Sequence, residues 1–389
     1  MGQSRSIGLE LSVFGLVAAT FTTIYITQPV LPVIQTEFGV SETVASLTIS
    51  LVVLGIALAN LPFGRLADLL PIRPIILAGG IMVTACGLCC ALTHSLPVLI
   101  AARFVQGLFL PALTTCLAAF LGRTLPPDRL NVVMGWYVSA TVAGGLSGRL
   151  LGGWIHPPLH WRCAFVTASV LLLCATLTGL VFLPRENRLR DTASASGDIG
   201  FLRLLARPDL LQILCTAFGS FFVFSSVFNY MPFYLAGPDF GASTRLITLI
   251  YLSYIIGVIM GPVAGRVANR FGNGPAMMAG SVVFAAALGV SLIPSLTAVL
   301  ISLSGICAGF FTVHSTAVGA LNRKLETSKG RANSLYVLFY YLGGYIGITV
   351  SGVMYLKFGW PGVTGLGAAM LLIPFFTGWR ERKEGFSKR

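Results

Sequence analysis

Residues 64–74 read GRLADLLPIRP and lie between two long apolar runs. A near copy, GRVANRFGNGP, occupies residues 265–275, so the two stretches are 201 positions apart in a chain of 389 residues. A repeat at half the chain length indicates that the protein consists of two similar halves. Each half is expected to turn around a short basic loop, and the acid Asp68 of the first loop is replaced by Asn269 in the second.

The composition predicts that most of the chain lies in a lipid bilayer. Hydrophobic residues make up 55% of the chain and charged residues only 10%, whereas soluble domains carry about 25% charged residues. The net charge of +13 is spread over short loops and the C-terminus, and the absence of a basic stripe argues against nucleic acid as a partner. The eight cysteines lie inside apolar runs without metal-ligand spacing, so neither a metal nor a cofactor is expected.

Twelve apolar segments are long enough to cross a bilayer, because a spanning helix needs about 20 apolar residues. They are residues 9–34, 43–63, 74–93, 97–120, 132–155, 163–183, 209–236, 245–264, 276–294, 297–320, 332–356 and 362–380. We therefore expect an all-α membrane protein with six helices in residues 1–183 and six in residues 209–389. The polar stretch 184–208 is interpreted as a cytoplasmic linker that contains a short interfacial helix near its end, from Phe201 to Leu205.

The Lys and Arg residues predict the orientation. Twenty-one of the 26 lie in the N-terminus, the C-terminal tail and the loops on one side of the predicted membrane. Because cytoplasmic loops carry the excess of positive charge, both termini are predicted to be cytoplasmic. The apolar run from Leu9 is long enough to span the bilayer, so no cleavable signal peptide is expected.

The repeat extends well beyond its first stretch. Three positions of the fifth predicted helix align with the eleventh at offsets of 199 positions, and Trp161 aligns with Trp360. The aligned pairs are Gly144 with Gly343, Gly148 with Gly347, and Gly152 with Ser351. Two six-helix halves of the same orientation are the parallel-repeat arrangement of one large class of transporters.

Three stretches carry a resemblance to a known family. Residues 64–74 resemble the motif between the second and third helices of the major facilitator superfamily. RFVQGLFLPA, residues 103–112, resembles its fourth-helix motif, and GWYVSATVAGGLSGRLLGG, residues 135–153, resembles its fifth-helix motif typical of antiporters. Over its whole length the chain resembles the twelve-helix drug:proton antiporter-like branch, close to bacterial inner-membrane permeases of the arabinose-efflux or multidrug type. Leu69, Pro71 and Arg149 depart from the family motifs, which have a basic residue, glycine and proline there.

The resemblance implies a cytoplasmic latch made by Gly64, Arg65, Asp68 and Arg73. Charge-assisted hydrogen bonds hold such a carboxylate, and it also favours the positive N-terminus of a neighbouring helix. The expected partner is the start of the eleventh helix near Arg331. The alternative is an ordinary loop whose arginines only fix the topology.

Four residues are candidates for coupling transport to protons. An intramembrane arginine is costly and faces a cavity or a partner, so the resemblance makes Arg103, with Gln106, part of proton coupling or substrate contact; the alternative is snorkelling to the outer interface. Arg149 either snorkels or places a positive charge at the mouth of the cavity. His314 is the only histidine inside a predicted helix, and no acid lies deep in one. If protons drive transport, His314 is the expected site, with Asp68 as the alternative.

Small residues four positions apart predict close packing of helices. The resemblance implies that the fifth helix pairs with the eighth, and the second with the eleventh, across the two halves, so that these seams allow one half to rock against the other. Tight static packing is the alternative. The glycines concerned are Gly135, Gly144, Gly148, Gly152, Gly257, Gly261, Gly265, Gly343 and Gly347.

The resemblance places the substrate cavity between helices 1, 4, 7 and 10 of the twelve. An aromatic wall with few polar groups suits amphipathic organic molecules, and neutral or weakly anionic substrates fit the arginines better than organic cations. The candidate cavity residues are Tyr25, Gln28, Phe222, Asn229, Phe311, Tyr336 and Tyr340.

The expected function is a secondary active transporter of the bacterial inner membrane, a proton-coupled exporter of small organic or amphipathic molecules by alternating access. Its partners would be the substrate, protons and the lipid bilayer, and the chain is expected to act as a monomer. The same fold could instead work as a proton symporter or facilitator that imports a sugar or an organic acid. A receptor or lipid-modifying enzyme is disfavoured, because the sequence has no Walker loop or nucleophile elbow, and no enzymatic activity is expected.

Overall fold

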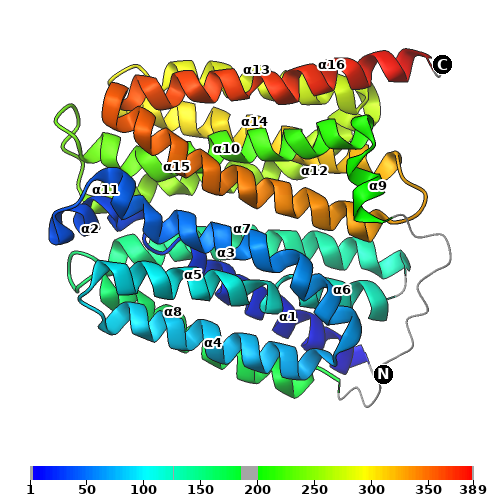
Figure 1. Cartoon of the computed structure of the whole chain (residues 1–389), viewed down its shortest axis with the longest axis horizontal. Helices are drawn as coiled ribbons and strands as arrows, with labels where there is room; N and C mark the ends of the chain where they lie inside the picture. The colour runs from blue at the N-terminus through cyan, green and yellow to red at the C-terminus, as the bar shows by residue number, and fades with distance from the viewer. Residues whose placement is uncertain (1–2, 126, 185–199, 388–389) are drawn as a thin grey trace. The chain divides into compact units, whose positions relative to one another are not determined.

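A computed structural model describes residues 3–125, 127–184 and 200–387. All regular structure among these residues is helical (Figure 1). The chain forms two compact units: the first comprises Met1–Phe38 and Leu47–Ala193, and the second comprises Gly39–Ser46 and Ser194–Arg389. Ten helices or helix runs among the described residues are long and apolar enough to cross a membrane. The predicted all-α membrane fold is thereby confirmed.

The first unit contains nearly all of the helices before the predicted linker; only the first turn of α3 groups with the second unit. These elements are α1 (Gln3–Ile24), η1 (Gln28–Val30), α2 (Leu31–Phe38), α3 (Glu42–Leu69), α4 (Ile72–Leu92), α5 (Leu96–Leu113), α6 (Thr115–Thr124), α7 (Pro127–Ile155) and α8 (Arg162–Phe182).

The second unit contains the remaining helices, which are α9 (Phe201–Leu205), α10 (Pro208–Ala236), α11 (Thr244–Ile250), η2 (Tyr251–Ser253), α12 (Tyr254–Phe271), α13 (Asn273–Val290), α14 (Leu296–Arg323), α15 (Lys329–Met370) and α16 (Leu372–Ser387). The backbone of α15 is non-helical at Gly359, with φ 61° and ψ −151°. The helical run Lys329–Lys383 therefore supplies two crossings, one before Gly359 and one that continues from the end of α15 into α16. With these two crossings and α7 included, each of the twelve predicted segments corresponds to a helix or to a run of adjoining helices among the described residues.

Each unit packs its helices in the same pattern. In the first unit α1 lies against α7 and α8, and α4 lies against α5 and α8. In the second unit α10 lies against α15 and α16, and α13 lies against α14 and α16. Since α10, α13, α14, α15 and α16 are the counterparts of α1, α4, α5, α7 and α8, the sequence repeat corresponds to two pseudo-symmetric halves.

The contact between α7 and α1 is made through glycines four positions apart. A Cβ atom on each of them would lie 1.9 to 2.3 Å from a carbonyl oxygen of α1 or of the turn that follows it. The pairs are Gly144 with Ala18, Gly148 with Thr22, and Gly152 with Ile26. Only residues without a side chain allow two backbones to approach this closely. These glycines therefore face a helix of their own unit, and the pairing of the fifth helix with the eighth stays a prediction.

The second unit repeats this contact between α15 and α10. A Cβ atom on Gly343 would lie 2.2 Å from the carbonyl oxygen of Phe218, and one on Gly347 would lie 2.5 Å from that of Phe222. At the third position the hydroxyl of Ser351 donates to Oγ of Ser226 over 2.9 Å. The other glycines of the predicted set make no close contact with a backbone. Among the described residues no atom lies within 4 Å of a Cβ built on Gly135, Gly261 or Gly265. A Cβ built on Gly257 would meet the ring of Phe311.

Two predicted boundaries are wrong. The first predicted helix, residues 9–34, is interrupted: α1 ends at Ile24, and the chain passes through a turn and η1 before α2 begins. Pro29 and Pro32 lack the backbone N–H that a continuous helix would need. The stretch 64–74 is also mostly helical and not a loop, because α3 continues to Leu69 and leaves only residues 70–71 as the connection to α4.

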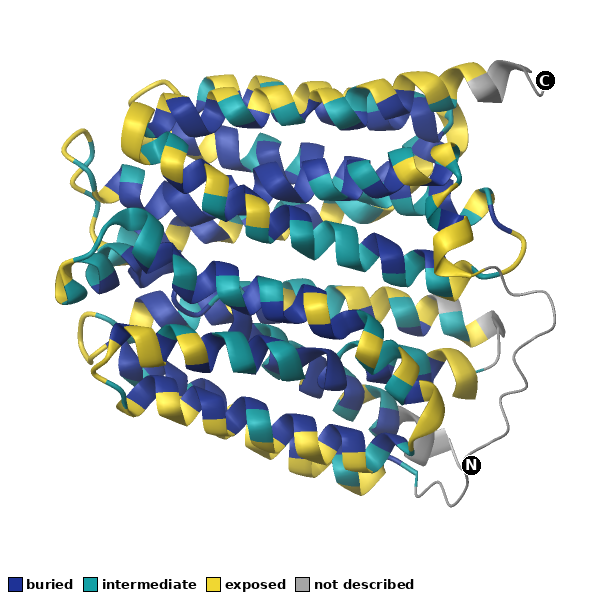
Figure 2. Cartoon of the chain, in the orientation of Figure 1, coloured by how far each residue is buried: buried dark blue, intermediate teal, exposed yellow. Residues whose placement is uncertain are grey.

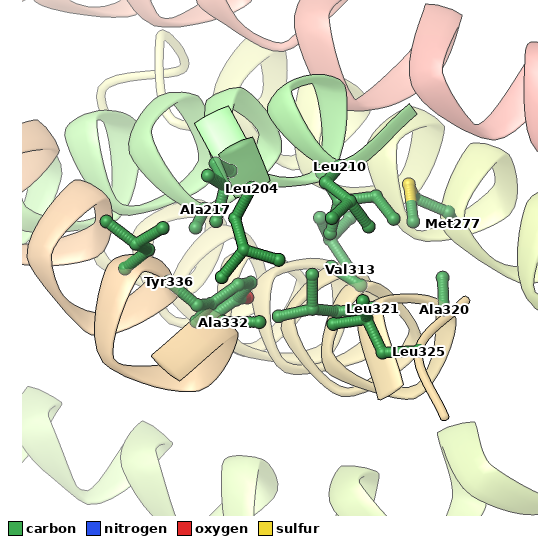
Figure 3. Packing of buried hydrophobic residues seen from close by; sticks show 14 residues of the cluster. Leu204, Leu210, Ala217, Met277, Val313, Ala320, Leu321, Leu325, Ala332 and Tyr336 are labelled. Carbon is green, nitrogen blue, oxygen red and sulfur yellow. The ribbon is translucent and has the colours of Figure 1, made fainter. Parts of the chain in front are cut away.

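The predicted short helix at the end of the linker is present as α9, while residues 185–199 of that linker lie outside the described residues. Leu204 of α9 is buried in an apolar cluster of the second unit. In Figure 3 its side chain points towards residues of α10, α14 and α15, among them Ala217, Val313 and Ala332. This contact anchors the start of the second unit's helices.

The exposed side chains on the outer helices are largely apolar. Figure 2 shows buried and exposed residues alternating along α4, and its exposed positions include Ile81, Leu88 and Leu92. On α8 the exposed residues include Val170 and Val181. Apolar side chains on the outside of long helices are expected where lipid is the solvent.

Candidate functional site

Arg103 on α5 is fully buried, with 0% of its surface exposed. Its guanidinium donates to main-chain carbonyl oxygens: Nε to Thr48 over 2.9 Å, Nη1 to Thr23 over 2.7 Å, and Nη2 to Ile24. Nη1 also donates to the side-chain oxygen of Gln106. All of these partners belong to the first unit.

These contacts explain why a buried arginine is stable here. Because α1 ends at Ile24, its last carbonyl groups have no partner within the helix, and the guanidinium supplies donors to two of them. Its charge also favours the negative end of the helix dipole. Gln106 extends the contact to α4 through a 3.2 Å bond from Nε2 to the carbonyl oxygen of Val83. Arg103 thus holds the end of α1; it does not reach the unit's surface, and its predicted coupling role stays a prediction.

Arg149 on α7 is also buried, with 2% of its surface exposed. Its Nε donates to Oε1 of Gln28 over 2.7 Å, and its Nη1 donates to the carbonyl oxygen of Gly145 over 2.7 Å. The guanidinium carbon lies 4.0 Å from the centroid of the Tyr25 ring, within the range of a cation–π contact. The structure therefore brings two predicted cavity residues, Tyr25 and Gln28, together with the predicted coupling residue Arg149.

The interruption of the first span lies between the two arginines. Arg103 binds the last carbonyls before the break, and Arg149 binds Gln28 within it. The sequence carried a signal for this interruption in Pro29 and Pro32, but the apolar run around them made the segment look continuous.

In the second unit, His314 on α14 is hydrogen-bonded to Tyr336 on α15, with 3.0 Å between Nδ1 and the phenolic oxygen. The imidazole is half-buried and Tyr336 is buried. The ring of Phe310 lies 5.8 Å from the imidazole and that of Tyr340 lies 5.3 Å from it, measured between centroids. Three predicted site residues, His314, Tyr336 and Tyr340, thus come together.

The aromatic side chains of α10 extend this cluster. Phe221 stacks on Tyr340 with ring centroids 3.7 Å apart, and Phe224 stacks on Phe310 at 3.9 Å. The predicted cavity residue Phe311 meets Phe310 edge to face at 5.2 Å, whereas the backbone of Phe222 lies against Gly347 of α15. The residues of α10 that stack in this cluster are thus Phe221 and Phe224.

Asn229 on α10 is buried and donates from Nδ2 to Oγ of Ser46 over 2.7 Å. Ser46 belongs to the second unit although it lies in the first turns of α3. The side-chain oxygen of Asn229 has no hydrogen-bond partner among the described residues. The NH2 group of this predicted cavity residue therefore donates a hydrogen bond, whereas its Oδ1 lacks a donor among the described residues.

Asp68 lies near the end of α3 and forms an ion pair with Arg123 on α6, with 3.1 Å between Oδ1 and Nη1. Arg123 also donates to the carbonyl oxygen of Ala67 over 2.6 Å. Arg73 approaches the carbonyl oxygen of Leu183 at 3.5 Å. These contacts are all within the first unit, and the latch between Asp68 and the region of Arg331 stays a prediction.

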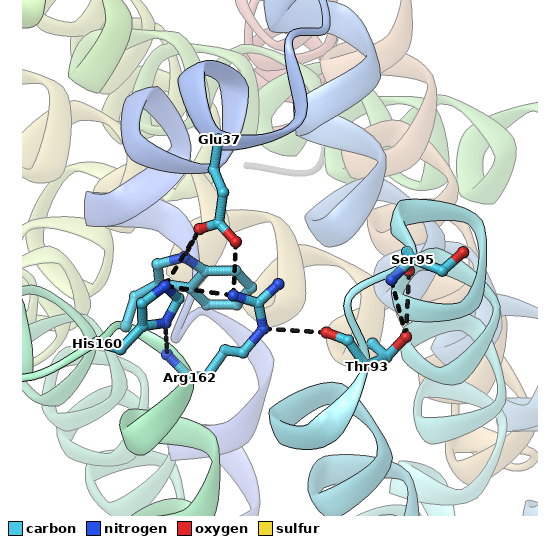
Figure 4. Close-up of polar contacts among 6 residues, drawn as sticks. Glu37, Thr93, Ser95, His160 and Arg162 are labelled. Atoms are coloured by element: carbon cyan, nitrogen blue, oxygen red, sulfur yellow. Dashed lines mark hydrogen bonds and ion pairs between the residues drawn. The ribbon is translucent and has the colours of Figure 1, made fainter.

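A polar cluster that the sequence analysis did not single out joins α2 to the start of α8 (Figure 4). The carboxylate of Glu37 accepts bonds from the guanidinium of Arg162 and, over 2.6 Å, from the indole N–H of Trp161. His160 Nε2 lies 3.4 Å from the same carboxylate, and Nε of Arg162 donates to the carbonyl oxygen of Thr93 over 3.0 Å. The cluster fixes the ends of three helices, and among the described residues no group of side chains could hold a metal ion.

Comparison with known proteins agrees with this architecture. The family model of the Major Facilitator Superfamily matches residues 13–322 and 235–389. "Inner membrane transport protein YnfM" of Escherichia coli K12 is 29% identical over 381 residues, which cover 97% of this chain and 91% of that protein. "Uncharacterized MFS-type transporter YybF" of Bacillus subtilis 168 is 29% identical over 360 residues, which cover 91% of this chain and 88% of that protein.

Two solved structures share the fold. A bacterial homologue of the human lysosomal transporter Spinster, in an inward-facing and unoccupied conformation, gives a TM-score of 0.77 at 16% identity and covers 100% of this chain and 99% of its own. A D-xylose-proton symporter gives a TM-score of 0.77 at 15% identity and covers 95% of this chain and 97% of its own. The chain belongs to the Major Facilitator Superfamily and is a membrane transporter.

Proposed function

We propose that this protein is a secondary active transporter of the bacterial inner membrane that exports small organic or amphipathic molecules in exchange for protons. It would act as a monomer with both termini in the cytoplasm, and its two halves would provide alternating access. The observation that carries the proposal is the position of His314, a titratable side chain in contact with an aromatic cluster. A proton and an apolar substrate would then occupy neighbouring places.

The chemistry of this group suits proton exchange. Imidazole is the side chain that gains and loses a proton nearest to neutral pH, whereas guanidinium groups such as that of Arg103 stay charged. The hydroxyl of Tyr336 can donate to the neutral ring and accept from the protonated one, so both protonation states of His314 keep a hydrogen bond. A substrate that packs on the aromatic rings beside the imidazole would compete with its proton, which is the requirement for antiport.

Replacing His314 with alanine is expected to reduce gradient-driven transport at least tenfold, because no other imidazole lies in the predicted spans. The measurement uses everted vesicles with an imposed pH gradient and a compound that the wild type protects against in a growth screen. Substrate exchange without a pH gradient should persist, since it needs no net proton movement. His94→Ala, at an exposed histidine, is the matched control. Full gradient-driven transport in His314→Ala would rule out this role.

The direction of transport can be measured in the same vesicles. Antiport predicts that substrate moves against the flow of protons, into everted vesicles with an acidic lumen. The second candidate function is import of a sugar or organic acid together with protons; the fold likeness to a D-xylose-proton symporter makes it worth testing. Movement of substrate in the same direction as the protons would favour symport.

Asp68, with Gly64, Arg65 and Arg73, is proposed to form a cytoplasmic latch. The ion pair with Arg123 holds the carboxylate at the end of α3, where its charge is available to the N-terminus of a neighbouring helix. Asp68→Asn is expected to lower transport more than tenfold while the amount of protein in the membrane stays normal. Asn269→Ala, at the matching position of the second half, should have little effect. Unchanged transport in Asp68→Asn would contradict the proposed role of Asp68 in a latch.

A further inference from the structure

We propose that a groove between α10 and α16 binds one anionic phospholipid, whose phosphate contacts Arg380. The groove has a volume of about 270 Å³ and lies within the second unit. One residue of α10 and five of α16 line it: Gln212, Leu372, Ile373, Phe376, Thr377 and Arg380. The site is independent of the proposed transport function, because it concerns the lipid around the protein and not the substrate.

The two helices that form the groove run antiparallel and are held together by close contacts. A Cβ atom on Gly219 of α10 would lie 3.3 Å from the carbonyl oxygen of Met370. Seven positions before Gly219, the carbonyl oxygen of Gln212 accepts a hydrogen bond from the buried hydroxyl of Thr377, over 3.4 Å. These contacts fix α10 against α16, so the walls of the groove have defined positions.

The groove is apolar at one end and basic at the other. Leu372 and Phe376 are each 53% exposed, and Arg380 is exposed as well. These three residues are four positions apart and form one stripe along α16, with Arg380 about 12 Å beyond Leu372. A phospholipid has the same sequence of groups, with acyl chains at one end and a phosphate at the other. The side-chain amide of Gln212 can donate a further hydrogen bond to the headgroup.

Trp379 indicates the depth of Arg380 in the membrane. Trp379 is 41% exposed, and Nζ of Lys383 lies 3.7 Å from the centroid of its ring. Tryptophans of membrane proteins are enriched at the level of the lipid headgroups. Because Arg380 follows Trp379 directly in the chain, its guanidinium lies at the depth of the lipid phosphates.

The charge of the groove favours an anionic headgroup over a zwitterionic one. Among the side chains that the structure describes, the acids of α10 and α16 are Asp209 and Glu381. Asp209 is paired with Arg207 at 2.7 Å and Glu381 with Lys324 at 2.8 Å, and neither acid lines the groove. A guanidinium binds phosphate by charge-assisted hydrogen bonds, and basic pockets between spanning helices bind anionic headgroups.

The experiment is native mass spectrometry of the purified full-length protein, titrated with dioleoylphosphatidylglycerol or with dioleoylphosphatidylcholine. The two lipids have the same acyl chains, and only the first has a net negative charge. Wild-type protein is expected to bind its first phosphatidylglycerol about fivefold more tightly than its first phosphatidylcholine. Arg380→Gln should bring this ratio close to one. Arg266→Gln, at an exposed arginine of α12, is the matched control and should keep the wild-type ratio.

Two further measurements test the position and the nature of the ligand. Leu372→Trp places a larger side chain at the apolar end of the groove and should weaken the first phosphatidylglycerol while Arg380 is intact. Glycerol 3-phosphate, which has the phosphate but no acyl chains, should not displace the lipid. Displacement by glycerol 3-phosphate would indicate a site for a free phosphate and would overturn the lipid as the ligand.

The remaining outcomes also decide the proposal. Equal affinity of the wild type for the two lipids, or an unchanged ratio in Arg380→Gln, would overturn the site. An equal loss of selectivity in Arg266→Gln would show that the overall positive charge attracts the lipid, and not this groove. Unchanged binding of phosphatidylglycerol by Leu372→Trp would place the lipid elsewhere on the protein.

Discussion

Replacing Arg103 with leucine is expected to leave little folded transporter in the membrane. Leucine fills much of the volume but donates no hydrogen bonds, so the carbonyl groups of Thr48, Thr23 and Ile24 lose their donor. Leaving a buried polar group unsatisfied costs about 1–3 kcal/mol. The carbonyls of Thr23 and Ile24 at the end of α1 would both be left so, at roughly 2–6 kcal/mol, whereas that of Thr48 lies inside α3 and keeps its helical partner. Native proteins are stable by only about 5–15 kcal/mol. The loss of Arg103 is therefore expected to remove a large part of the stability of the fold.

Fluorescence-detected gel filtration of the membrane extract measures this effect as the amount of monodisperse protein and as its melting temperature. Arg266→Leu, which removes an exposed arginine from helix α12, is the matched control and should melt like the wild type. Arg103→Lys should be intermediate, since an ammonium cannot reach several carbonyl groups with the fixed fork of a guanidinium. A leucine variant as stable as the Arg266 control would show that Arg103 does not hold the end of α1.

The fold itself was predictable because its signals are local. Apolar runs of sufficient length predict spanning helices whatever the helices pack against, and the repeat of residues 64–74 at 265–275 predicts two halves. The partners of Arg103 were not predictable in this way. Backbone carbonyls become available only where a helix stops, and the stop at Ile24 is weakly marked by two prolines inside an apolar run.

The same limit applies to contacts between helices. His314 and Tyr336 were both candidates, but they are 22 positions apart on different helices, and only packing reveals that they are bonded. The spacing of Gly144, Gly148 and Gly152 correctly indicates a face that another backbone can approach. It does not specify which backbone, and the assignment to a helix of the other half came from the resemblance alone. The structure pairs this face with α1.

Gly148→Ala is expected to destabilise the first unit although it adds a single methyl group. That methyl carbon would lie 2.2 Å from the carbonyl oxygen of Thr22, so α7 and α1 would have to separate by roughly 1 Å to restore ordinary contact. Overpacking of a close interface costs about 1–3 kcal/mol, occasionally more. Because α7 moves as a unit, the contacts of Gly144 and Gly152 with α1 would be lost as well. Transport should fall together with stability, because a shift of Gly148 also displaces the next residue, the predicted coupling residue Arg149.

Gly135→Ala is a matched control because it lies on the same helix α7 and receives the same methyl group. Gly135 is exposed, and a Cβ built there meets no described atom within 4 Å. Alanine is favoured over glycine inside a helix by about 1 kcal/mol, so this variant should melt at or above the temperature of the wild type. The two substitutions are thus expected to shift the melting temperature in opposite directions.

Gly347→Ala should repeat the effect of Gly148→Ala in the second unit, where the methyl carbon would lie 2.5 Å from the carbonyl oxygen of Phe222. If Gly148→Ala and Gly135→Ala melt alike, close contact between α7 and α1 is not what these glycines provide.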